Sequence, residues 1–134
     1  MLKDLIIQDF GKKEDLNCAE KILQGANIVY SLGLDKESLK LASGFGGGMG
    51  IEDKCGALTA AIMVLGKMFV SDRAHESDRI KRLTRKLFAE FNKEMSSIDC
   101  APLKKNYRSE KYGCKVIIVK AAEILDRLIE EEKN

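Results

Sequence analysis

The sequence predicts an all-α fold: a single-domain bundle of about five helices over residues 1–134, with a glycine-rich loop before a central buried helix. The chain has one proline in 134 residues, and few of its stretches alternate β-branched with polar residues. Apolar residues instead recur with the helical period of 3.6. No internal repeat or linker-like stretch divides the sequence, so we expect one domain.

Helix-start and helix-stop signals place the elements in order. Asn17 is a good N-cap, Glu20 completes a capping box with it, and Gly33 ends the first helix. A second, shorter helix follows Asp35 as its cap. Further helices are expected at about residues 53–68, 74–95 and 113–131, with one short helical turn from residue 100.

The segment from about residue 53 to 68 is apolar on two faces. Leu58 and Leu65 belong to its main face, and Ala57 and Val64 belong to a second face that is also apolar. A helix that is apolar nearly all round is buried at the centre of a bundle. Its small residues let neighbouring helices approach closely.

Five glycines occur within residues 44–50, immediately before this central helix. They favour a tight, irregular connection with positive φ angles. Two alternatives stay open, both of which use the backbone N–H groups of Gly46, Gly47, Gly48 and of Gly56 at the helix start. The loop can cradle a phosphate, as in a small-ligand binding module, or it can surround a metal centre and donate hydrogen bonds to sulfur.

Composition narrows the class of protein. With 23 basic and 21 acidic residues the chain is nearly neutral, which argues against a nucleic-acid partner or an anionic membrane surface. We see neither a signal peptide nor a transmembrane stretch and expect a cytoplasmic protein. In a reducing compartment, cysteines are free thiols, metal ligands or transient disulfides rather than permanent cross-links.

The four cysteines each fall where a helix is expected to begin. Helix N-termini favour thiolates, and helix starts in a bundle can converge, with Cys55 expected at the middle of the site. Four converging thiolates suit an iron–sulfur cluster or a tetrahedral zinc ion, whereas two pairs make thiol/disulfide couples. These candidate redox or metal-binding residues are Cys18, Cys55, Cys100 and Cys114.

Another class of function also stays open, that of a non-catalytic helical interaction or dimerisation domain. Buried cysteine often acts as a small apolar side chain, so the four thiols can be core filler. The apolar N-terminal segment LKDLII, residues 2–7, is a surface on which a second copy can pack to form a homodimer.

Five segments carry a resemblance to a known family. They are NCA at 17–19, LASGFGGGMG at 41–50, CGALTAAIMVLG at 55–66, SSIDC at 96–100 and YGC at 112–114. Together they resemble the C_GCAxxG_C_C family, described as redox-active proteins with four characteristic cysteines. The start of its CGAxxG motif matches residues 55–57, while Ala60 stands in place of the final glycine.

The resemblance implies a redox role, and related domains in split-Soret cytochromes are associated with an iron–sulfur centre. We therefore expect the four cysteines to hold an iron–sulfur cluster, or alternatively zinc, for electron transfer with a redox partner protein. Thiol/disulfide couples, which need no cofactor, are the other redox interpretation.

Overall fold

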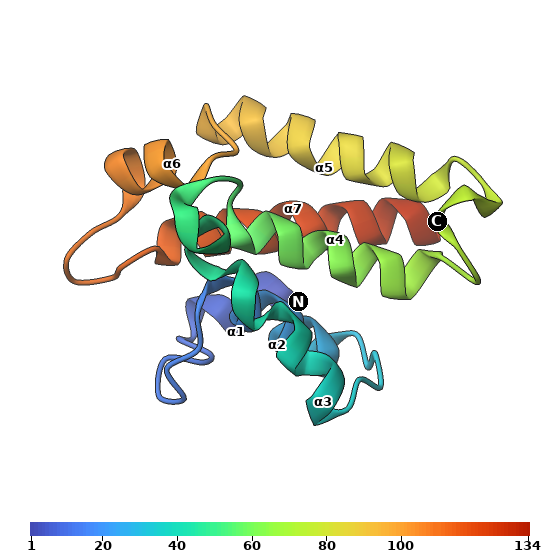
Figure 1. Cartoon of the computed structure of the whole chain (residues 1–134), viewed down its shortest axis with the longest axis horizontal. Helices are drawn as coiled ribbons and strands as arrows, with labels where there is room; N and C mark the ends of the chain where they lie inside the picture. Colours follow the sequence, from blue (N-terminus) through green and yellow to red (C-terminus); the bar gives the residue numbers. More distant parts are fainter.

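Helices form nearly all of the regular structure in the computed structural model, which describes residues 1–134 (Figure 1). The predicted all-α fold is confirmed. The helices are α1 (Leu2–Ile7), α2 (Cys18–Val29), α3 (Lys36–Leu39), α4 (Gly56–Phe69), α5 (Arg79–Met95), α6 (Cys100–Tyr107) and α7 (Lys115–Lys133). There are thus seven α-helices rather than about five, because α1 was not predicted and the turn expected at residue 100 is a full helix.

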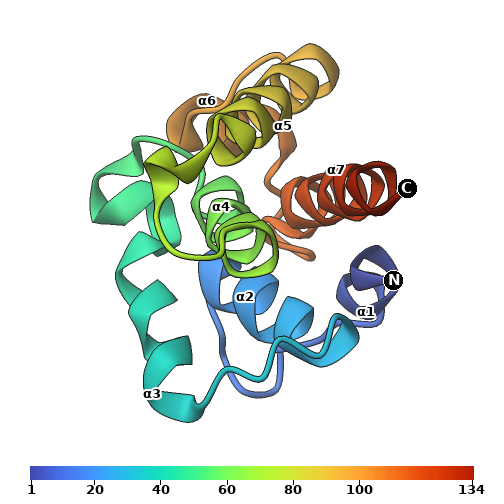
Figure 2. The same cartoon turned by 90° about the vertical axis from the view of Figure 1, so that its right-hand side faces the viewer.

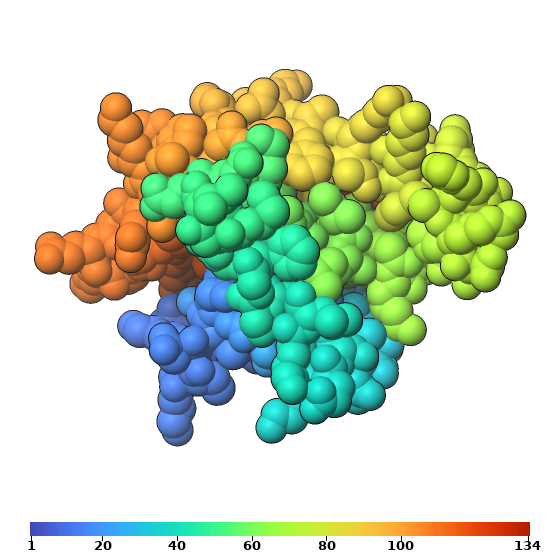
Figure 3. Space-filling view, in the orientation of Figure 1, coloured from blue at the N-terminus to red at the C-terminus, as the bar shows by residue number.

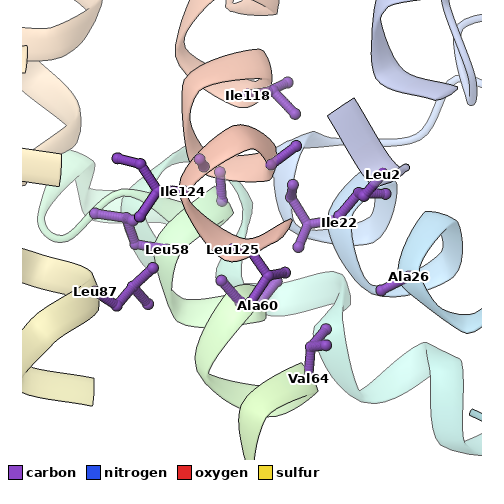
Figure 4. Close-up of a cluster of buried hydrophobic side chains, with 14 of the residues drawn as sticks. Leu2, Ile22, Ala26, Leu58, Ala60, Val64, Leu87, Ile118, Ile124 and Leu125 are labelled. Carbon is purple, nitrogen blue, oxygen red and sulfur yellow. The ribbon is translucent and has the colours of Figure 1, made fainter. Parts of the chain in front are cut away.

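The helix α4 lies at the centre of the bundle, as its two apolar faces predict. It packs against α2, α5 and α7, and Figure 2 shows it surrounded by them. Leu58, Ala60 and Val64 are fully buried, and Figure 4 shows Ala60 beside Leu125 of α7. None of the helices combines the length and apolar character that crossing a membrane requires.

The helix starts agree with the sequence at two places and differ at three others. Asn17 and Glu20 form the predicted capping box of α2, and Asp35 accepts a hydrogen bond from the Ser38 amide. The helix α4 begins three residues later than expected, and α5 begins at Arg79 after a 3-10 turn at Ala74–Glu76. Asp99 does not cap α6, because its carboxylate pairs with Lys54 instead.

The N-terminal apolar segment packs in part against the rest of the chain, which leaves Ile7 exposed, and the homodimer stays a prediction. Leu2 and Ile6 of α1 are buried, and α1 packs against α7 and α2. Asp126 of α7 accepts hydrogen bonds from the backbone amides of Leu2 and Lys3 at 3.0 and 2.9 Å, and from the Tyr30 hydroxyl. One carboxylate therefore caps α1 and fastens it to α7 and α2.

We expect Asp126→Ala to lower the free energy of unfolding by about 2 kcal/mol, because it leaves the first amides of α1 and the Tyr30 hydroxyl without their acceptor. Urea denaturation measures this loss. The matched control is Glu130→Ala, which removes an exposed carboxylate one turn further along α7 that makes no salt bridge. Equal effects of the two substitutions would contradict the role assigned to Asp126.

Candidate cysteine site

The structure brings the four predicted cysteines to one end of the bundle, where all of them line a single cavity of about 310 Å³. The starts of α4, α6 and α7 lie together at the left of Figure 1. Cys18 and Cys100 are the first residues of α2 and α6, and Cys55 and Cys114 immediately precede α4 and α7. All four are free thiols.

A short antiparallel pairing joins the segments that carry Cys55 and Cys100. The Cys55 amide donates to the Ile98 carbonyl at 2.9 Å, and the Cys100 amide donates to the Asp53 carbonyl at 2.5 Å. Across this β-bridge, the Lys54 ammonium contacts the Asp99 carboxylate at 2.7 Å. The bridge fixes two of the four cysteines relative to each other before any ligand binds.

The glycine-rich segment forms the tight, irregular connection that was predicted. Gly47 and Gly48 have φ angles of 62° and 61°, in the left-handed region that favours glycine. A Cβ on Gly48 would lie 2.7 Å from the Cys100 Cβ. Gly47 lines the cysteine cavity, whereas Gly46 packs against the Asn17 side chain. The segment thus lies close against two of the cysteine-bearing helix starts.

Gly56 packs equally closely against the cysteine site. A Cβ at this position would lie 2.8 Å from Cys18 Sγ and 2.5 Å from the Phe45 carbonyl oxygen. Gly56 itself lines the cavity. The absence of a side chain here allows the starts of α2 and α4 to bring their thiols together.

Burial outweighs the helix N-termini in setting the thiol pKa values. Loss of solvent raises the pKa of Cys55 to about 12, although the backbone N–H groups of Leu58 and Ala57 oppose that shift. Burial also raises the pKa of Cys100 and of Cys114, against the nearby cations Lys104 and Arg108. The expectation of lowered thiol pKa values is therefore wrong for these three cysteines.

The four thiols differ in how far the surrounding structure encloses them. Cys18 and Cys114 are half-buried, and Cys100 is 8% exposed. Cys55 is instead the most enclosed, at 5% exposure. Cys55 is therefore the least accessible thiol of the site.

We expect iodoacetamide to modify Cys55 last in the reduced, metal-free protein at pH 8. Its thiol is buried and has a pKa near 12, whereas Cys18 and Cys114 are only half-buried. Raising the pH toward 12 should keep accelerating modification of Cys55, because the thiolate is the reactive form. Mass spectrometry of the digested protein gives the order, and rapid modification of Cys55 at pH 7 would contradict it.

Sequence reasoning missed the cations at this cavity. Lys21, Lys104 and Arg108 line it together with Tyr112. Arg108 and Tyr112 lie between α6 and α7, and no spacing pattern in the sequence marks them as lining the cysteine cavity. His75, the only histidine, is exposed and lines a different part of the surface.

No three histidine, cysteine, aspartate or glutamate side chains come close enough together to bind one ion. The cavity offers four thiols as possible metal ligands. Apolar residues that include Leu103, Ile117 and Ile118 also line it.

Comparison with known proteins gives one match. Residues 16–128 match the family model described as "Putative redox-active protein (C_GCAxxG_C_C)", which covers most of the chain and all four cysteines. No curated protein and no solved structure matches the chain.

Proposed function

Because the chain belongs to the C_GCAxxG_C_C family, we propose that its four cysteines form one redox site, which holds an iron–sulfur cluster and exchanges electrons with a partner protein. The observation that carries this proposal is the convergence of four thiols, from four helix starts, on one cavity. If the cysteines served only as small apolar side chains of the core, four of them from distant parts of the sequence would have no reason to line the same cavity.

The donor set and the space among the thiols favour a cluster over a single zinc ion. Zinc requires four ligands at about 2.0–2.3 Å from one point, and the side chains here do not gather in that way. A cluster of several iron and sulfide ions keeps its cysteine ligands further apart. The four thiols around a cavity of about 310 Å³ suit such a group.

The cluster supplies one-electron transfer when bound, and the chain sets the conditions for it. The β-bridge holds Cys55 and Cys100 in fixed positions. Apolar side chains, including Leu103 and Ile117, restrict water at the cavity wall. Glu52 pairs with Lys104 at 3.0 Å, so Arg108 supplies the unpaired positive charge nearby, which stabilises an added electron and raises the reduction potential.

Anaerobic purification followed by iron and acid-labile sulfide analysis tests the proposal, together with absorption and electron paramagnetic resonance spectra. We expect stoichiometric iron and sulfide in the wild-type protein. Replacement of any one cysteine by serine, which is similar in size, should lower the iron content while circular dichroism shows an intact helical fold. Protein without iron or sulfide, or serine variants with full iron content, would overturn the proposal.

A second redox function is favoured by the position of Cys18. Cys18 is a free thiol that lines one cavity with the other three, so it can form a disulfide within the site, as in a thiol/disulfide couple. Metal-free wild-type protein titrated with oxidised glutathione should then form an intramolecular disulfide that Cys18→Ser abolishes. If the wild-type protein is purified without iron or sulfide and loses two free thiols on this titration, the thiol/disulfide function is favoured over the cluster.

A further inference from the structure

A second, basic cavity adjoins the cysteine cavity and shares with it Lys21, Tyr112, Gly113 and Ile118. Its volume is about 210 Å³. It lies between the N-terminal loop after α1 and the segment before α7, which border the notch between blue and orange atoms at the left of Figure 3. Its charged lining residues are Asp9, Lys12, Lys21, Lys111 and Lys115.

Four lysines face one carboxylate in this cavity, and the carboxylate neutralises only one of them. Lys115 contacts Asp9 at 2.8 Å, whereas Lys12, Lys21 and Lys111 form no salt bridge. Lys115 and then Lys12 and Lys21 lower the pKa of Asp9, which places these cations close to the same carboxylate. An unneutralised excess of positive charge therefore remains in one hollow of a nearly neutral protein.

Tyr112 is an exposed residue that lines both the basic cavity and the cysteine cavity. The Lys111 and Lys115 ammonium groups lie 5.2 and 5.9 Å from the centre of its ring, within the range of cation–π contacts. The Tyr112 ring thus contacts two of the four lysines that line the basic cavity. Because Tyr112 lines both cavities, a molecule bound among the lysines lies directly beside the thiols.

We propose that the lysine-lined cavity beside the cysteines binds a small molecule that carries phosphate, sulfate or carboxylate oxygens. The three unpaired ammonium groups repel one another, and a bound oxyanion removes that repulsion while accepting charge-assisted hydrogen bonds. The concave shape favours a small ligand over the flat acidic face of a protein. The site does not depend on whether the cysteines hold a cluster.

Isothermal titration calorimetry of the anaerobically purified protein with inorganic phosphate and with citrate tests the site at low ionic strength. We expect saturable binding that weakens as potassium chloride is added, because salt screens the lysines. Lys12→Ala combined with Lys111→Ala, two lysines that do not line the cysteine cavity, should weaken the affinity by about tenfold. The control pair Lys67→Ala and Lys93→Ala removes the same charge from exposed positions outside both cavities. This pair should leave the affinity for the anion nearly unchanged.

Three outcomes would overturn the proposal. They are absence of binding to either anion, equal weakening in the two double variants, and binding of a glutamate-rich peptide in place of the small anions. The lysine variants should also keep the wild-type iron content, and Cys18→Ser should keep phosphate binding. A failure of the anion site can thus be told apart from a failure of the cluster.

Discussion

Gly56→Ala is expected to lower the free energy of unfolding by about 1–3 kcal/mol and to disturb the cysteine site together with the fold. The added methyl group would lie 2.5 Å from the Phe45 carbonyl oxygen and 2.8 Å from Cys18 Sγ. A backbone oxygen cannot move aside cheaply, so the start of α4 must shift away from the start of α2. We therefore expect less iron per folded molecule as well as a lower melting temperature.

The same helix provides the matched control. A Cβ on Gly66 would meet nothing within 4 Å, and this residue is helical. Gly66→Ala should therefore stabilise the protein by about 0.5–1 kcal/mol through helix propensity alone. The prediction fails if both substitutions change urea stability in the same direction, or if Gly56→Ala keeps the wild-type iron content.

Local signals account for the parts of the structure that the sequence predicts well. The capping box at Asn17 and Glu20 depends on four consecutive residues, and the apolar faces of α4 follow from its periodicity. The placing of cysteines at helix starts follows from the same boundaries. The small side chain of Ala60 is fully buried and lies beside Leu125, as expected of a central helix that neighbouring helices approach closely (Figure 4).

The features that the sequence did not predict depend on contacts between segments far apart in the chain. The helix α1 is short, and it docks because Asp126, more than 120 residues later, accepts its first amides. The bridge between Lys54 and Asp99 likewise redirects a carboxylate that looks like a helix cap. The direction of the thiol pKa shifts depends on burial, which no spacing of cysteines specifies.

Leu58→Ala is expected to lower the free energy of unfolding by about 2–5 kcal/mol, the range for truncating a fully buried leucine. Leu58 is 0% exposed in the first turn of α4, and Figure 4 shows it between Leu87 of α5 and Ile124 of α7. Its loss leaves a cavity where three helices meet. Urea denaturation measures the effect, and Ile62→Ala, one turn later at a half-buried position, should cost clearly less.

The effect of Leu58→Ala on the cysteine site should differ from that of Gly56→Ala, although the two residues are two positions apart. Leu58 does not line the cysteine cavity, whereas Gly56 does and packs against Cys18 Sγ. At a temperature where the Leu58 variant is fully folded, it should retain the wild-type iron content and alkylation order. Loss of the site in the folded variant would mean that the core sets the geometry of the thiols, and not the close approach of helix starts that Gly56 permits.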